Sequence, residues 1–367
     1  MTLKSFLCLG LLASCTYLSA QQSDTLIIYT EIQEVNINAL RATEQTPMSF
    51  TNISQEQLEE QNLGQDIPYM LSLTPSVVTT SDAGAGIGYT GFRVRGSDPT
   101  RINVTIDGIP LNDAESQGVW WVNMPDFTSS VDDIQIQRGV GTSTNGAGAF
   151  GASVNLKTQG LRTKAYATTN NTVGSFKTLK NNVEFGTGLL MNKFTFDGRL
   201  SRISSDGYID RATSDLKSLY LSGGYYGNDE QLKLTLISGK EKTYQAWNGV
   251  PLAYINDDKL RTFNSYTYEN ETDNYWQDHY MVHYSKQLSS SAKLNIGLHF
   301  THGEGYYEQY KSDESFSDYG LTDVNIGNDT ISKTDLIRRK WLDNDFYGAI
   351  FSYSNSMDKL DYIVGGG

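Results

Sequence analysis

The sequence FRVRGSDPTRINVTIDGIPL, residues 92–111, decides the fold. Apolar and polar residues alternate in residues 92–95 and again in residues 102–106, and such alternation is typical of β-strands. Asp107-Gly108 follows the second run, and this dipeptide is a strong signal for a tight turn. The stretch therefore predicts short strands joined by turns.

Short helices and further strands surround this stretch. Ser54 and Gln57 have the spacing of a capping box and predict the start of a helix. A second helical turn is expected over residues 66–73, ahead of Pro75, because the residue before a proline avoids helical geometry. We therefore expect residues 46–160 to form a compact domain of mixed helices and strands. Its further strands are expected at residues 134–137 and 153–156.

The pattern changes after residue 160 to longer segments that have one apolar and one polar face. Residues 232–236 read LKLTL, and residues 294–300 read LNIGLHF. A soluble β-sandwich and a membrane-spanning β-barrel both give this alternation. Short predicted turns alternate with long polar connections at about 240–275 and 302–338, and this asymmetry is typical of outer-membrane barrels. Residues 161–367 are therefore expected to be antiparallel strands of a transmembrane β-barrel.

Residues 1–20 have the layout of a secretory signal peptide. Lys4 precedes an apolar run, and small residues lead to Ala20. A rival interpretation is a lipoprotein signal, which would place a lipid on Cys15. Both cysteines, Cys8 and Cys15, lie in this segment, so a chain cleaved after Ala20 has no disulfide and no cysteine-ligated metal.

Composition argues against a nucleic-acid-binding protein and against an enzyme. The net charge of −13 leaves no basic stripe for phosphates. His279 and His283 are four residues apart, but on a strand this spacing spans about 13 Å, which is too far for one metal ion. We therefore predict no catalytic residues, no metal site and no cofactor.

Four blocks of the chain together resemble the plug domain of TonB-dependent outer-membrane receptors. They are residues 92–96, 104–111, 131–139 and 145–156, in the order and at the spacing of the family. The resemblance implies a receptor in the outer membrane of a Gram-negative bacterium, with an α+β plug domain inside a 22-stranded β-barrel. Residues 161–367 are too few for 22 strands of about 9–11 residues each and their loops. An incomplete barrel is therefore expected.

The resemblance also implies a TonB box, a short extended segment that pairs with the TonB energy-transducing complex. We expect it within a periplasmic segment at residues 21–45. Residues 24–28 are an alternative to the preferred segment, and pairing by strand addition uses mainly backbone groups, so a loose sequence signal is expected. The preferred segment is Glu31, Ile32, Gln33, Glu34, Val35, Asn36 and Ile37.

Three arginines of the plug are candidates for an electrostatic latch. The resemblance implies that Arg93, Arg95 and Arg138 pair with acidic residues of the barrel wall. Arginines enclosed in a plugged barrel would need such a counter-charge. The alternative is that they are ordinary solvated arginines.

Ligand contacts are expected from plug loops that face outward. Adjacent tryptophans are packing residues as often as they are a ligand platform, so Trp120 and Trp121 fit both interpretations. Trp247, Tyr306 and Tyr307, in the long connections, are weaker candidates. The expected ligand-binding residues are Asp82, Ser97, Asp98, Trp120 and Trp121.

The sequence therefore predicts an importer rather than an enzyme, energised through TonB by the proton gradient of the inner membrane. The expected ligand is a scarce small molecule, and a ferric siderophore or related metal chelate is the first choice. Glycan importers of the family usually carry an extra domain before the plug, for which residues 21–31 leave no room. The alternatives are a glycan importer of the same family and a passive β-barrel porin or surface adhesin.

Overall fold

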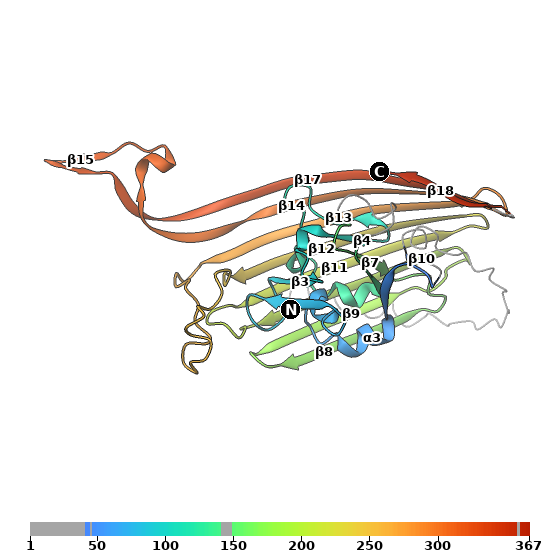
Figure 1. Ribbon diagram of the computed structural model, residues 1–367, viewed down its shortest axis with the longest axis horizontal. Coiled ribbons are helices and arrows are strands. Elements are labelled where there is room, and N and C mark those ends of the chain that lie inside the picture. The colour runs from blue at the N-terminus through green and yellow to red at the C-terminus, as the bar shows by residue number, and fades with distance from the viewer. Residues whose placement is uncertain (1–40, 45, 141–148, 358–359) are drawn as a thin grey trace, which may run out of the picture. The chain divides into compact units, whose positions relative to one another are not determined.

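The computed structural model describes residues 41–44, 46–140, 149–357 and 360–367, all within one unit joined by internal contacts (Figure 1). Short elements up to Thr158 form what we call the plug region. Nine longer strands from Tyr166 onward form what we call the wall sheet. Among the described residues, no helix is both long enough and apolar enough to cross a membrane.

The plug region is a small mixed domain. Five of its strands form one sheet in the order β1-β6-β7-β4-β5, in which β4 and β7 run parallel and the other neighbours antiparallel. Strands β2 and β3 form a separate antiparallel hairpin. The predicted mixture of short helices and strands is confirmed. In chain order the elements are β1 (Ser49–Ser54), α3 (Gln55–Gln61), α4 (Ile67–Met70), β2 (Val77–Ser81), β3 (Thr90–Val94), η2 (Pro99–Arg101), β4 (Ile102–Ile106), β5 (Ile109–Pro110), η3 (Trp121–Asn123), η4 (Phe127–Ser130), β6 (Val131–Arg138) and β7 (Ala152–Thr158).

Two local sequence signals set the geometry of the plug region. The backbone N–H of Gln57 donates to Ser54 Oγ, and the backbone N–H of Ser54 donates to Gln57 Oε1, so the predicted capping box starts α3. Asp107 and Gly108 have φ values of 49° and 83°, a left-handed conformation that aspartate tolerates and glycine adopts freely. The predicted turn therefore joins β4 to β5.

The core of the plug region is apolar and centres on its sheet. Strand β4 is buried along its whole length, because β7 and β5 flank it and the wall sheet lies near. Each fully buried side chain of this size contributes about 1.5–3 kcal/mol. The central residues are Ile102, Val104, Ile106, Ile134, Ile136, Val154 and Leu156.

The wall sheet is a run of antiparallel strands in which chain neighbours are also neighbours in space. The predicted antiparallel order of the segments between residues 194 and 301 is confirmed. A small hairpin of β15 (Val324–Ile326) and β16 (Asp329–Ile331), with η6 (Phe316–Tyr319) before it, separates the two longest strands. The nine strands are β8 (Tyr166–Gly174), β9 (Thr178–Gly186), β10 (Phe194–Ser205), β11 (Ser214–Tyr226), β12 (Glu230–Tyr244), β13 (Thr272–Gln287), β14 (Ala292–Ser315), β17 (Lys333–Met357) and β18 (Leu360–Gly366).

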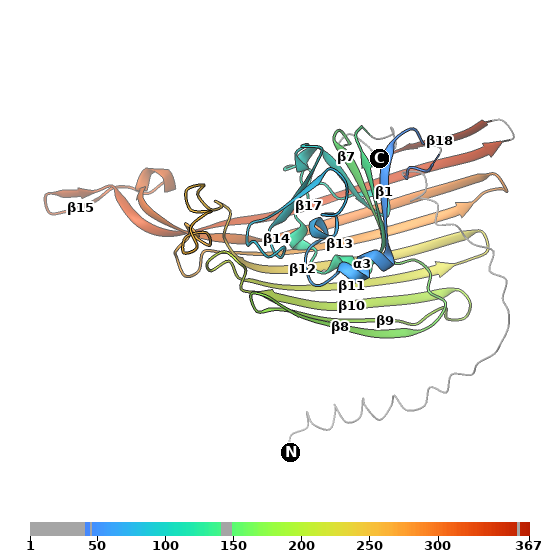
Figure 2. The same cartoon turned by 60° about the horizontal axis from the view of Figure 1, so that its bottom comes forward.

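The two faces of the wall sheet differ in the predicted sense. On β12, Leu234 is 50% exposed, whereas its neighbours Lys233 and Thr235 are buried. On β14, Leu298 is 48% exposed and Asn295 is buried. The plug region lies on one side of the wall sheet (Figure 2), and Lys233 of the polar face donates to Thr158 of the plug, so the apolar residues point away from the plug. This is the arrangement that a lipid-facing wall requires.

One expectation about loops is wrong. The segment 302–338 was expected to be a long polar connection, but β14 continues to Ser315 and β17 begins at Lys333. The two strands remain paired, from Ala292 with Asn355 to Ser315 with Lys333. Tyrosines and charged residues are mixed along this extension, so the alternation that marks a half-buried strand is weak although the backbone ladder continues.

Candidate functional site

The plug region is held to the wall sheet by a buried carboxylate at the start of η4. Asp126 Oδ1 lies 2.6 Å from Lys180 Nζ on β9, and Asp126 Oδ2 lies 3.3 Å from Arg199 Nη1 on β10. Asn182 Nδ2 and Ser201 Oγ also donate to Asp126 Oδ2. Burial alone would raise the pKa of Asp126, but Arg199 and Lys180 outweigh it and hold the pKa well below its ordinary value.

A second buried carboxylate lies in the turn between β4 and β5. Asp107 accepts hydrogen bonds from the backbone N–H and the hydroxyl of Thr158, and its Oδ2 lies 3.4 Å from Lys233 Nζ on β12. The ring of His283 on β13 bonds to the Asp107 carbonyl oxygen at 3.0 Å. Burial opposes ionisation, yet Lys233 and His283 lower the pKa of Asp107. Asp107 is therefore both a turn residue and a contact to the wall.

The backbones of the two parts also meet directly. A Cβ added to Gly239 on β12 would overlap the carbonyl oxygen of Asn123 in η3. A glycine is therefore needed at this position for η3 to lie against the strand. This contact fixes the segment that carries Trp120 and Met124.

A cavity of about 770 Å³ lies between the plug region and the wall sheet. Residues from the plug segment between Ile109 and Met124, together with Asp82 and Tyr89, form one side. Strands β12, β13, β14 and β17 and the connection after β12 form the other. Its volume is in the range of sites for small organic ligands and cofactors.

Aromatic rings line much of this cavity. The ring of Tyr89 lies edge-on to Trp120, with centroids 6.1 Å apart, and edge-on to Trp247 at 5.4 Å. Trp247 in turn lies 5.5 Å from Tyr307. Trp120 is 51% exposed. The rings therefore form a connected platform whose outermost member is free to contact a ligand.

The polar part of the cavity lining is acidic. Tyr89 Oη donates to Asp273 Oδ2 at 2.5 Å, and Thr243 Oγ1 donates to Glu241 Oε2 at 3.0 Å. Burial raises the pKa of Asp82 to about 6. Burial and the neighbouring carboxylates also raise the pKa of Tyr89. The lining carboxylates are Asp82, Asp113, Glu115, Glu241, Asp273 and Asp343.

The structure separates the predicted ligand-binding residues into two groups. Asp82 and Trp120 line the cavity. Trp121 is buried and packs on Phe92, with ring centroids 6.0 Å apart, so it takes the packing role. Asp98 accepts from the backbone N–H of Thr100 at the start of η2. Neither Asp98 nor its neighbour Ser97 is among the residues that line this cavity.

Sequence reasoning missed several lining residues. Glu241 and Asp273 belong to different strands, and no local signal marks either of them. Of the weaker candidates, Trp247 and Tyr307 line the cavity, and Tyr306 is not among its lining residues. Among the described residues, no group of three or more histidine, cysteine, aspartate or glutamate side chains is arranged to hold a metal ion.

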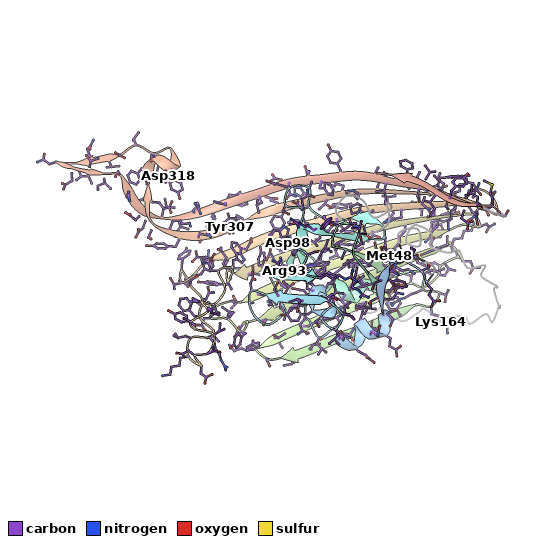
Figure 3. The ribbon with its side chains drawn as sticks, viewed as in Figure 1. Met48, Arg93, Asp98, Lys164, Tyr307 and Asp318 are labelled. Atoms are coloured by element: carbon purple, nitrogen blue, oxygen red, sulfur yellow. The ribbon has the colours of Figure 1, made fainter. Side chains whose placement is uncertain are left out.

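The predicted latch arginines contact plug atoms. Arg138 donates to the hydroxyls of Ser49 and Thr51 on β1. Arg95 Nη1 lies 3.5 Å from the Arg138 carbonyl oxygen. Arg93 Nη1 lies 3.4 Å from Asp98 Oδ2 (Figure 3).

A latch through these arginines stays a prediction. The buried ion pairs that join plug to wall in the structure have the opposite polarity, with acids on the plug and bases on the wall. The candidate TonB box at Glu31–Ile37 and the signal peptide lie outside the described residues.

Comparison with known proteins agrees with this architecture. Residues 42–153 match the family model of the TonB-dependent receptor plug domain. The chain is similar to the ferric-catecholate import receptor Fiu from E. coli K12 in its open form, with a TM-score of 0.65, 14% identity, and 87% of this chain matched to 48% of that one. None of the curated proteins matches it.

Two further solved structures give the same result. For the siderophore receptor PirA from Acinetobacter baumannii the TM-score is 0.61 at 15% identity, covering 86% of this chain and 46% of that one. For the unliganded ferric citrate transporter FecA the TM-score is 0.62 at 18% identity, and the match covers 87% of this chain and 46% of that one. The chain thus spans about half the length of the structures it matches.

The matched plug domain, the buried polar contacts between plug and wall, and the outward apolar face of the strands form one consistent arrangement. TonB-dependent receptors are outer-membrane β-barrel proteins of Gram-negative bacteria. Residues 42–153 are thus a plug domain of the TonB-dependent receptor type, and the strands that follow have the fold of the barrel wall in the receptors named above.

Proposed function

We propose that the protein imports a scarce small molecule, a ferric siderophore or related metal chelate, across the outer membrane. The cavity between plug and wall carries this proposal. Its volume of about 770 Å³ suits a small organic ligand, and its connected rings offer a binding platform. The similar solved structures named above include an import receptor for ferric catecholates and a ferric citrate transporter, which supports the chelate class.

Asp126 and Asp107 hold the plug to the wall through buried ion pairs. Import therefore requires that the plug move relative to the wall against these contacts. The outer membrane has no nucleotide supply. The energy therefore comes from the proton gradient of the inner membrane, through a TonB complex that pairs with Glu31–Ile37 by strand addition. The plug moves and no bond of the ligand is broken, so the protein acts as a transporter rather than an enzyme.

A glycan importer of the same family is the second candidate, because the exposed ring of Trp120 also suits stacking on a sugar ring. A passive porin is less favoured. Two sets of buried ion pairs hold the plug against the wall, and a freely open pore has no use for them.

Uptake into cells that lack their own siderophore receptors tests the proposal. The full-length protein is expressed there, and accumulation of radioactive iron from a panel of ferric chelates is compared with accumulation of labelled oligosaccharides. We expect iron uptake that stops when an uncoupler dissipates the proton gradient. Uptake of oligosaccharides alone would move the ligand to the glycan class. Uptake that survives the uncoupler would replace active import with a passive pore.

A further inference from the structure

The charge of the cavity restricts what it can bind, if the cavity is the ligand site proposed above. In the part of the chain that the structure describes, six carboxylates and the histidines His279 and His299 line it, and no lysine or arginine does. Among the described residues, the ion pairs include none of these six carboxylates. Glu241 and Asp273 are only 2% and 5% exposed. Buried carboxylates without a counter-charge are costly, so this is an unusual concentration of acidic groups that a cation would stabilise in their charged form.

The rest of the interface shows that this chain does supply counter-charges to buried acids. Asp126 is matched by Lys180 and Arg199, and Asp107 is matched by Lys233. These pairs lie between the same plug region and the same wall sheet. Among the described residues, lysine and arginine are therefore absent from the lining of this cavity and not from the plug–wall interface as a whole.

Buried polar atoms without a hydrogen-bond partner also favour a ligand that carries hydrogen-bond donors. Asp273 Oδ1 and Asn123 Oδ1 are buried in the cavity lining with no hydrogen-bond partner, and so is Nε2 of His279. The two oxygens are hydrogen-bond acceptors, whereas the His279 nitrogen can donate or accept. A ligand that satisfies the two oxygens must bring donors, and an ammonium group carries three donors and no acceptor.

The aromatic platform also favours a cationic ligand. The faces of tryptophan and tyrosine rings attract cations, and Trp120 and Trp247 lie beside Tyr89 at the acidic end of the cavity. Tyr307 already has Lys340 Nζ 5.8 Å from its ring centroid. Trp120, which is 51% exposed, is thus the ring of this platform that is most open to a ligand.

We infer that this receptor takes a chelate bearing a positively charged amine, which Glu241, Asp273 and Asp82 bind while Trp120 and Trp247 contact its apolar body. An anionic chelate, such as a ferric tricatecholate or ferric citrate, would meet six carboxylates in this cavity, and among the described residues neither lysine nor arginine lines it to offset them. The inference rests on the proposed function and narrows it to a ligand charge.

Paired ligands that differ only in charge test this inference. A ferric linear trihydroxamate with a free terminal amine is cationic at pH 7, and the same chelate with an acetylated amine is neutral. Ferric citrate is the anionic probe. Each is titrated into the full-length protein in detergent, and binding is followed by quenching of tryptophan fluorescence. We expect the cationic chelate to bind roughly tenfold or more tightly than its acetylated form, which corresponds to about 1.4 kcal/mol.

Three substitutions locate the effect. Asp273→Asn and Asp82→Asn should each lower the ratio of the affinity for the cationic chelate to the affinity for its acetylated form. The effect of Asp273→Asn should be larger, because Asp273 is more deeply buried than Asp82. If Asp273→Asn fails to fold by circular dichroism, Asp82→Asn on the plug still tests the idea. Asp318→Asn is the matched control, because Asp318 is exposed on η6 between β14 and β17, away from the cavity (Figure 3). This control should keep the wild-type ratio.

The outcomes separate the two proposals. Equal affinity for the cationic and acetylated chelates, or a preference for ferric citrate, would overturn the inference and leave iron import standing. The non-iron cation benzyltrimethylammonium distinguishes the reverse case. If it binds in a manner that depends on Asp273 while no ferric chelate binds, the charge selectivity is supported and the ferric chelate assignment is wrong.

Discussion

Lys180 Nζ on wall strand β9 lies 2.6 Å from Oδ1 of Asp126 in the plug region, and both side chains are almost completely buried. A buried ion pair is weak evidence for stability as a pair, but removing one member leaves the other charge stranded in a dry interface. This contact therefore resists separation of plug and wall without requiring that the pair itself be strongly favourable.

Asp126→Asn should loosen the plug. The substitution leaves Lys180 and Arg199 buried without a counter-charge, which costs about 3–5 kcal/mol. The measurement is the urea concentration at which tryptophan fluorescence reports release of the plug. Asp215→Asn is the matched control, because the Asp215–Arg202 pair is exposed and screened by water. Equal shifts in the two variants would contradict the role given to Asp126.

The fold was predictable where short-range rules operate. Ser54 and Gln57 show the capping box, Asp107-Gly108 shows the turn, and residues 232–236 show which face of the strand is apolar. Each signal depends on neighbours within a few positions of the chain. The extension of β14 and β17 was not predictable, because tyrosines and charged residues are mixed along it and only the backbone ladder defines it.

The site was predictable only in part, because strands from distant parts of the sequence build it. Glu241 and Asp273 meet since Thr243 pairs with Asp273, and a shift of one residue in that register would turn either side chain to the other face. The polarity of the buried ion pairs could not be predicted for the same reason. Lys180 and Lys233 follow the ordinary alternation of a barrel strand, and only the docked plug shows which acids they meet.

Asp66 should make the stability of the plug depend on pH. Burial is the largest cause that raises the pKa of Asp66, from 3.8 to about 8, although Thr90 donates to its carboxylate. Between these two pH values the folded plug holds a proton that the unfolded chain releases, so folding stability falls as pH rises through this window.

Asp66→Asn keeps a hydrogen-bond acceptor for Thr90 and has no proton to lose. The variant should therefore gain stability relative to the wild type as pH rises from about 4 to 8, measured by urea denaturation at each pH. A constant difference between the two proteins over this range would show that Asp66 titrates normally.

The adjacent tryptophans should give opposite results. Trp120→Ala should weaken ligand binding with little effect on the unfolding midpoint, because Trp120 is half-exposed at the cavity. Trp121→Ala should cost about 3–5 kcal/mol of stability, because Trp121 is buried against Phe92. Titration and urea denaturation of both variants check this. If the two variants lost similar amounts of ligand affinity and of stability, the separate roles given to Trp120 and Trp121 would be wrong.

The central claim is active import by a plug that TonB pulls, and proline substitution in the candidate TonB box tests it most directly. Proline removes a backbone donor and fixes φ, which blocks pairing by strand addition, whereas alanine leaves the backbone free. In the full-length protein, Val35→Pro should abolish chelate uptake while binding at the cell surface stays nearly unchanged, and Val35→Ala should be mild. Loss of uptake with proline at Ile27 instead would move the box to residues 24–28. Uptake that survives both proline substitutions would contradict the account.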